Sequence, residues 1–357
     1  MSIIIFLLIL SALVFVHELG HFLVAKKNGI RVDEFAIGFP PKLFSVKKGE
    51  TTYAINLLPL GGYVKIFGEN PDDESTNGPD KERSFVNKSK LVQASVLVAG
   101  IVFNILFAFV LFSASFVVGV SGLGEQTDGS KLVVAGVLKD SAASIGGIQE
   151  GDIITKLSGK TELSDINAET VREFVNQSDG ASIQVTVLRG NETKLLEITP
   201  KKDTKQDVYL VGIQMMELSE VKLPIHKAIV EGAKMTVLVV KETTVGIVHF
   251  LWNIVTFNAN FKDVAGPVGI AGLVGEASKF GLGYLFSFAA LISINLAVIN
   301  LIPFPALDGG RLLFVAIEAI TRKPLNPKIA NTLNLVGFVL LLVLMVAVTF
   351  SDIKKLF

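Results

Sequence analysis

The stretch SIIIFLLILSALVFVHELGHFLVA (residues 2–25) sets the class of this protein. It is apolar for most of its length, yet His17, Glu18 and His21 are gathered near its end. About 20 apolar residues allow a helix to cross the hydrocarbon core of a bilayer. No basic segment precedes the run, as one would in a secretory signal peptide, so we interpret residues 1–25 as a retained membrane span.

The composition agrees with a membrane protein. The chain has 357 residues, of which 50% are hydrophobic and 18% are charged, and its mean hydropathy is +0.56. Soluble domains carry roughly 25% charged residues. The formal net charge is +0, so nothing indicates a nucleic-acid partner. We therefore expect an integral membrane protein that also carries some soluble mass.

Three further apolar runs are long enough to span a bilayer. Together with the first run they predict a multi-pass α-helical membrane protein with about four transmembrane helices. The predicted spans are residues 1–25, 91–120, 283–310, and 333–357 including a short tail.

Lysine and arginine residues predict the orientation of these spans. They concentrate in residues 26–90 and 311–332, and cytoplasmic loops carry such an excess. Both termini and residues 121–282 are then expected outside the cytoplasm. Within the first loop, TTYAINLLPLGGYVK (51–65) combines strand-forming residues with a Pro-Leu-Gly-Gly turn. We expect a cytoplasmic, membrane-associated β-hairpin region there.

The segment after the second span reads as two parts. Residues 121–205 alternate strand and helix patterns, with strands SIQVTVLR and TKLLEITP joined by a turn at Gly190 and Asn191. They predict a small α/β module. In residues 206–282, charged side chains interrupt the apolar stretch 221–261, which favours a pair of surface-lying amphipathic helices. A fifth span near 243–257 is the alternative.

His17 and His21 have the spacing of a metal site. Residues four apart lie on one face of a helix, where two imidazoles can bind one Zn²⁺. Glu18 lies between them, where a carboxylate can activate water. Ionisable groups in the hydrocarbon layer are costly and indicate function. A polar helix face packed against other spans is the alternative interpretation.

A catalytic zinc usually has three protein ligands. The chain contains no cysteine, so His226, His249 or a carboxylate must supply the third. The strongest candidate is Asp308 in NLIPFPALDGG (300–310), where two prolines break the third span and two glycines follow the Asp. Non-helical backbone at membrane depth is tolerated where it lines a cavity, and a metal ligand needs such a place.

HELGH (17–21), VAGIVFN (98–104) and NLIPFPALDGG (300–310) resemble motifs of the site-2 protease family of intramembrane zinc metalloproteases. The chain is most similar to the bacterial branch, the RIP metalloproteases that regulate sigma-E. Three further matches occur in the expected order: GGYVK (61–65), SAASIGGIQEGDII (141–154) and GPVGIA (266–271). The resemblance covers nearly the whole chain.

The resemblance implies one Zn²⁺ per chain, bound by His17, His21 and Asp308, with Glu18 as catalytic base. It implies that Asn300 binds substrate or stabilises the oxyanion, and that Asn104 and Asn295 lie near the substrate channel. In the hairpin region, Gly61, Gly62 and Tyr63 could pair with an unwound substrate as an added strand.

The resemblance also implies location and partners. Residues 121–205 would be a single extracytoplasmic PDZ domain, where some family members carry two, and a peptide could bind to it. The protein would lie in a bacterial cytoplasmic membrane, with its active site toward the cytoplasm. Its expected substrates are single-pass membrane proteins, such as anti-sigma factors or remnant signal peptides.

Two functions of other classes compete with proteolysis. A non-proteolytic membrane PDZ scaffold would not need Glu18. A metal transporter would need a chain of ligands across the bilayer, and His226 and His249 fall in the segment expected outside.

Overall fold

The structure is a computed structural model that describes residues 2–70, 73–122, 130–190, 192–203, 208–256, 258 and 265–356. The chain divides into two compact units. One comprises Met1–Val117 and Pro224–Phe357, and the other Val118–Leu223.

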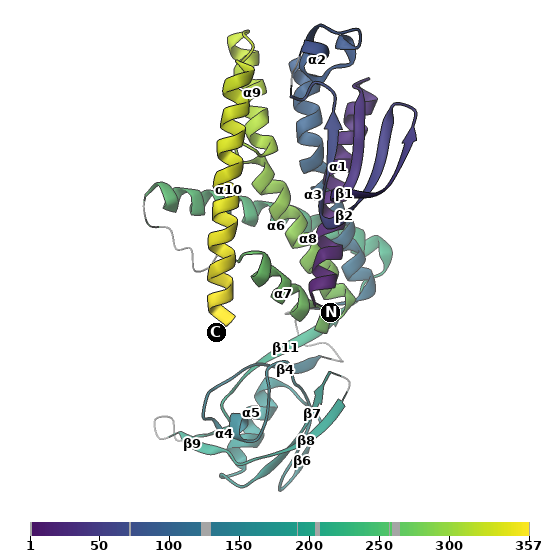
Figure 1. Ribbon diagram of the computed structural model, residues 1–357. Helices are drawn as coiled ribbons and strands as arrows, with labels where there is room; N and C mark the ends of the chain where they lie inside the picture. The colour runs from purple at the N-terminus through teal and green to yellow at the C-terminus, as the bar shows by residue number, and fades with distance from the viewer. Residues whose placement is uncertain are drawn as a thin grey trace. The chain divides into compact units, whose positions relative to one another are not determined.

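The first unit is mainly helical (Figure 1). Its long helices are α1 (Ser2–Lys27), α3 (Lys90–Val118), α6 (Ile225–Val255), α7 (Pro267–Lys279), α8 (Leu282–Leu301), α9 (Asp308–Thr321) and α10 (Pro327–Leu356). Among the described residues, α1, α3, α6, α8 and α10 are long and apolar enough to cross a membrane. Several such helices are typical of an integral membrane protein.

Helix α6 differs from the prediction of two helices in residues 221–261. A single helix runs from Ile225 to Val255, because this stretch contains no proline to end it. Its charged side chains Lys234, Lys241 and Glu242 are exposed. In Figure 1, α6 runs across the direction of α10.

Small residues allow the helices of this unit to approach closely. A Cβ on Gly20 of α1 would stand 2.6 Å from the Ala99 carbonyl oxygen of α3. Further along α3, Ala108 and Phe112 pack with Ile294 of α8, and Val239 of α6 lies against them. Helix α3 is thereby packed against both α1 and α8.

The predicted hairpin region is present, and its turns differ in detail from the prediction. Strands β1 (Val32–Lys48) and β2 (Thr51–Ile66) are joined at Gly49 and Glu50. Residues 34–37 of β1 pair with residues 62–65 of β2 and also with residues 52–55. Residues 59–61 of the Pro-Leu-Gly-Gly stretch lie between these two sets of partners, so the stretch is a bend within β2 and not a turn between two strands.

The second unit is built on a sheet in the order β3-β11-β4-β5-β7-β8, with β6 beside β5. The strands of the unit are β3 (Val120–Gly122), β4 (Lys131–Val137), β5 (Ile153–Ser158), β6 (Glu162–Leu163), β7 (Ile183–Arg189), β8 (Glu192–Ile198), β9 (Lys201–Asp203), β10 (Val208–Leu210) and β11 (Ile213–Val221), of which β9 and β10 form a separate pair. The short helix α4 (Ala142–Ile145) and helix α5 (Ala168–Gln177) accompany the sheet.

Local sequence explains the helix starts of this unit. Ser141 caps α4, and Asn167 forms a capping box with Thr170 at the start of α5. Val171 and Val175 of α5 join the buried core of the sheet. The strands predicted as SIQVTVLR and TKLLEITP are confirmed as β7 and β8. Asn191 in the predicted turn lies outside the described residues.

Candidate metal centre and active site

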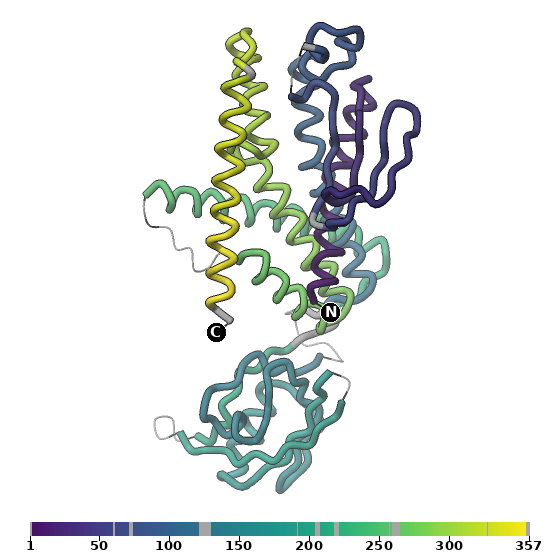
Figure 2. Tube along the Cα trace, in the orientation of Figure 1, coloured from purple at the N-terminus to yellow at the C-terminus, as the bar shows by residue number. Residues whose placement is uncertain are grey.

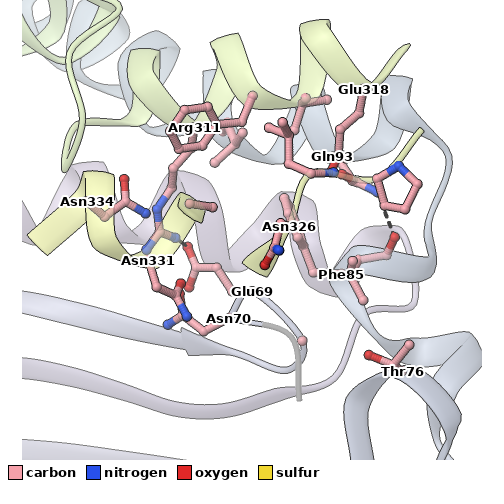
Figure 3. A pocket seen from close by; sticks show the side chains of 18 residues that line it. Glu69, Asn70, Thr76, Phe85, Gln93, Arg311, Glu318, Asn326, Asn331 and Asn334 are labelled. Atoms are coloured by element: carbon pink, nitrogen blue, oxygen red, sulfur yellow. Dashed lines mark hydrogen bonds and ion pairs between the residues drawn. The ribbon is translucent and has the colours of Figure 1, made fainter. Parts of the chain in front are cut away.

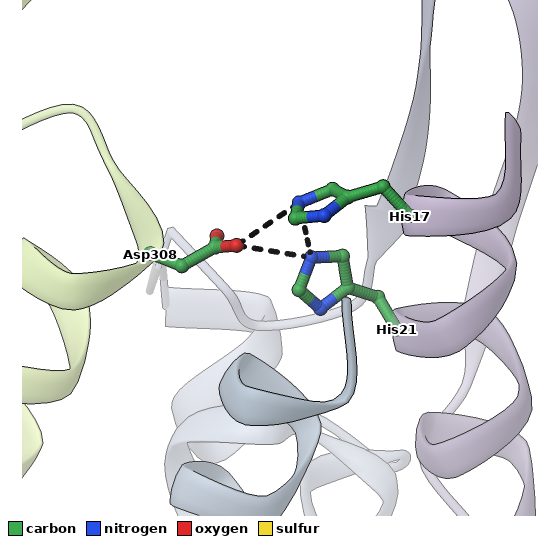
Figure 4. A group of neighbouring side chains, drawn as sticks. All are labelled: His17, His21 and Asp308. Carbon is green, nitrogen blue, oxygen red and sulfur yellow. Dashed lines mark hydrogen bonds and ion pairs between the residues drawn. The ribbon is translucent and has the colours of Figure 1, made fainter. Parts of the chain in front are cut away.

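His17 and His21 stand one turn apart on the same buried face of α1. Asp308 begins α9 and reaches the same place from the other end of the sequence. Its Oδ2 lies 3.0 Å from His17 Nε2 and 3.3 Å from His21 Nε2, and the two Nε2 atoms lie 3.1 Å apart. Figure 4 shows the three side chains converging.

The local chain path explains why Asp308 arrives there. Pro303 and Pro305 prevent α8 from continuing past Leu301, and Figure 2 traces the short connection to α9. The new helix starts close against this connection: a Cβ on Gly309 would stand 2.3 Å from the Ile302 carbonyl oxygen. Asp308 is therefore the first helical residue, whereas the sequence suggested non-helical backbone around it.

The donor atoms fit a metal ion. His21 Nδ1 lies 2.8 Å from the Val96 carbonyl oxygen, so the neutral ring keeps its proton on Nδ1 and presents the Nε2 lone pair to Asp308. Asp308 Oδ2 is buried without a hydrogen-bond partner. Lone pairs facing each other in a buried place require a cation between them.

The spacing of the donors points to zinc. Zinc ligands about 2.1 Å from the ion in a tetrahedral arrangement stand roughly 3.4 Å apart. The three distances, 3.0, 3.1 and 3.3 Å, lie close to that value. Two imidazoles and one carboxylate are a typical donor set for a catalytic zinc with an open position.

Glu18 lies beside the cluster. Its carboxylate interacts electrostatically with His17, His21 and Asp308 and is within hydrogen-bonding range of the Val64 backbone amide. The GGYVK segment of β2 is therefore adjacent to the predicted base. A Cβ on Gly62 would lie 3.7 Å from Val14, one turn before His17.

Tyr63 belongs to a polar group inside the hairpin region. Its hydroxyl donates to Glu34 Oε1 at 2.9 Å, and Lys42 Nζ lies 2.6 Å from the same oxygen. Burial acts to raise the pKa of Glu34, but hydrogen bonds from Lys42 and Tyr63 outweigh it, so that pKa lies below its usual value. Glu34 therefore stays charged and ties the two strands together.

The three predicted asparagines have different surroundings. Asn104 is fully buried, and its Nδ2 lies 3.3 Å from His17 Nδ1. Asn295 and Asn300 are partly buried on α8, and within the described part of the chain neither side chain has a hydrogen-bond partner. His226 and His249 are exposed on α6 and do not belong to the metal-ligand cluster.

Gly100 was not among the site residues predicted from the sequence. A Cβ at this position of α3 would stand 2.5 Å from His21 Nε2 and 2.7 Å from His17 Cε1. Any larger residue would push the imidazole rings aside. The available signal was a glycine in the middle of an apolar span, where small residues indicate close approach of a neighbour.

A cavity of about 590 Å³ lies beside α9. Figure 3 shows its polar lining, which includes Arg311, one turn after Asp308. Arg311 forms an ion pair with Glu69, and Glu318 pairs with Lys90 of α3 at 2.5 Å. These two pairs connect α9 to the segment after β2 and to the start of α3.

The comparisons with known proteins agree with this site. The model of Peptidase family M50 matches residues 5–344. A candidate zinc metalloprotease of Clostridium perfringens is 40% identical, over 99% of this chain and 98% of its own length. The zinc metalloprotease RasP of Geobacillus kaustophilus is 32% identical, over 100% of this chain and 98% of its own length. The regulator of sigma-W protease RasP of Bacillus subtilis is 30% identical, over 100% of this chain and 99% of its own length.

A solved structure is similar to part of the chain. It is the PDZ domain of an SdrC-like protein from Listeria monocytogenes, 19% identical, covering 26% of this chain and 92% of its own, with a TM-score of 0.21.

Proposed function

Because the chain belongs to peptidase family M50 and is a zinc metalloprotease, we propose that it cuts single-pass membrane proteins within or beside the bilayer. One observation carries this proposal: two histidines of an apolar helix meet a carboxylate from the distant α9 with their donor atoms 3.0–3.3 Å apart. A buried cluster of this kind has no role in a purely structural membrane helix.

His17, His21 and Asp308 hold the zinc ion in this proposal. The bound ion supplies Lewis acidity that polarises the scissile carbonyl. Glu18 takes the proton from the attacking water and later gives it to the leaving nitrogen. The carboxylate is close enough to His17, His21 and Asp308 to interact with them electrostatically. Asn300, in the last turn of α8, donates to the developing oxyanion.

A transmembrane helix must unwind before its peptide bond can react, since its carbonyl groups are already hydrogen-bonded. The GGYVK segment of β2 supplies a place for the unwound chain. Val64 lies next to Glu18, so a substrate paired as a strand beside Gly61, Gly62 and Tyr63 would run past the base.

The topology of the proposal has four spans, α1, α3, α8 and α10, with α6 along the membrane surface. The exposed charges on α6 and its direction across α10 in Figure 1 support this assignment. The basic segments 26–90 and 311–332 then face the cytoplasm of a bacterium, and the active site lies toward that side.

The second unit serves as an extracytoplasmic PDZ-like module in this proposal. A cavity of about 580 Å³ lies between α5 and the chain around β10, and its lining includes Val175, Tyr209 and Met215. An extended peptide could occupy it. The Bacillus subtilis relative is named for regulating sigma-W, so anti-sigma factors are the first substrate class to test, and remnant signal peptides the second.

The two competing functions have less support. A transporter needs a relay of sites, and in the part of the chain that the structure describes only one group of three possible ligands is found. A scaffold predicts that Glu18 can be replaced without effect.

Glu18→Gln tests the proposal. Membranes from cells carrying this variant should accumulate intact single-pass fragments, which mass spectrometry identifies, while Glu242→Gln on the exposed face of α6 should not. An unchanged set of membrane peptides in Glu18→Gln cells would rule proteolysis out.

A further inference from the structure

Three positions of α3 face the two histidines in succession. Val96, Gly100 and Asn104 are spaced four residues apart, so they lie on one face of the helix, and all three are buried. The Val96 carbonyl oxygen contacts His21, Gly100 leaves room for both rings, and Asn104 contacts His17.

The contact at His21 defines how a ligand ring is held. Its Nδ1–H donates to a carbonyl oxygen, which leaves Nε2 free for a metal ion. Metal-binding histidines nearly always donate their second ring N–H to such an acceptor, which fixes the tautomer and the ring plane. His17 needs the same arrangement, because its Nε2 also belongs to the cluster.

Asn104 can supply that acceptor. The Asn104 Nδ2 lies 3.3 Å from His17 Nδ1, and the Asn104 Oδ1 is buried without a hydrogen-bond partner. The oxygen and nitrogen of an amide exchange places by a half turn, and only the hydrogen-bond network distinguishes them. After that turn Oδ1 accepts a hydrogen bond from the His17 Nδ1–H. This one hydrogen bond gives the buried oxygen a partner and also fixes the tautomer of His17.

The backbone around Asn104 is fixed as well. Its carbonyl oxygen accepts a hydrogen bond from Ser293 Oγ of α8 at 2.8 Å, and both residues are fully buried. This hydrogen bond ties α3 to α8 at Asn104, so the Asn104 side chain is held firmly enough to restrain the His17 ring.

We propose that Asn104 is a positioning residue: its side-chain oxygen accepts the His17 Nδ1 proton and so directs His17 Nε2 to the metal. This replaces the substrate-contact role expected for Asn104. The inference rests on the proposed function, because it requires His17 to bind the zinc ion.

The test compares zinc affinities by chelator competition on the full chain in detergent, with Glu18→Gln present throughout so that no cleavage interferes. Asn104→Leu keeps the size but has no acceptor, and it should weaken zinc binding about 10- to 100-fold. Asn104→Asp restores an acceptor and should bind zinc within about threefold of the parent. Ser115→Ala, a buried position of α3 whose hydroxyl bonds only its own helix, is the matched control and should not change affinity.

A second measurement excludes misfolding as the cause. In the zinc-free protein, the ¹⁵N spectrum of the His17 ring should show Nδ1 protonated in the parent and in Asn104→Asp, and mixed tautomers in Asn104→Leu. Equal affinities of Asn104→Leu and the parent, or an Asp variant as weak as the Leu variant, would overturn the inference. His17→Ala separates the two proposals. Unchanged zinc affinity in His17→Ala refutes the metal site itself. If His17→Ala loses zinc while Asn104→Leu binds it as tightly as the parent, only the role of Asn104 is refuted.

Discussion

Asp308 Oδ2 lies 3.0 Å from His17 Nε2, although the two residues come from opposite ends of the chain. The contact exists because α8 ends at Leu301, before two prolines, and α9 begins at Asp308 after a short connection, with this first carboxylate directed at α1. Replacing the side chain should remove a ligand without disturbing the apolar packing around it.

Asp308→Ala should therefore lose zinc. We expect affinity to fall by more than the roughly 10- to 100-fold that changes around a metal site produce, because a direct ligand is removed. Equilibrium dialysis against zinc buffers measures it. Asp179→Ala, an exposed aspartate in the second unit, is the control. Tight binding by Asp308→Ala would assign the third ligand elsewhere.

Gly100→Ala should lower zinc affinity only because the added methyl group takes up space at the site. The added methyl would overlap both imidazoles, at 2.5 and 2.7 Å, so the rings must leave their shared position. Zinc affinity should drop at least tenfold, even though alanine is better than glycine in a helix by about 1 kcal/mol. Gly272→Ala in α7, with nothing within 4 Å, should leave zinc affinity unchanged. Equal zinc binding in the two variants would show that the rings do not lie against α3.

Arg189 should determine how acid affects the second unit. Asp152 is fully buried and accepts from Arg189 Nε at 2.7 Å. Burial acts to raise the pKa of Asp152. Hydrogen bonds from Arg189 and the Gln149 N–H lower this pKa by more than burial raises it, so it lies below its usual value. The pair thus stabilises the fold above about pH 4 and loses this effect as pH falls through the lowered pKa.

Arg189→Ala should cost about 3 kcal/mol at neutral pH, because it leaves a buried carboxylate unpaired. The variant should also lose less stability than the parent on acidification, since the unpaired carboxyl gains from protonation. Hydrogen exchange of the β5 and β7 amides, corrected for the intrinsic rate at each pH, measures both effects. Lys160→Ala, from an exposed pair, should behave like the parent, and parallel pH curves for all three proteins would contradict the assignment.

The orientation of α6 can be tested because the chain has no cysteine. Single cysteines at His226→Cys and Trp252→Cys mark the two ends of the helix, and both positions are exposed. A membrane-impermeant thiol reagent added outside intact cells should label both if α6 lies on the surface. Labelling of only one end would make α6 a fifth span. Lys81→Cys in the basic loop should stay unlabelled.

Much of the site could be predicted from the sequence because its signals are local. The spacing of His17 and His21 needs only helix geometry, and Asp308 stands out between prolines and glycines. The role of Gly100 was not predictable, since it depends on which face of α3 meets α1. The bend within β2 was not predicted either. Residues 34–37 pair with two separate parts of β2, and such pairing between strands is set by tertiary contacts.

Zinc content and cleavage, measured together on the purified full chain, test the central claim most directly. Wild type should bind one zinc ion per chain and cut a single-pass substrate, and Glu18→Gln should bind the same zinc and cut nothing. His17→Ala should do neither. A Glu18→Gln protein that still cuts, or a His17→Ala protein that keeps its zinc, would contradict the account.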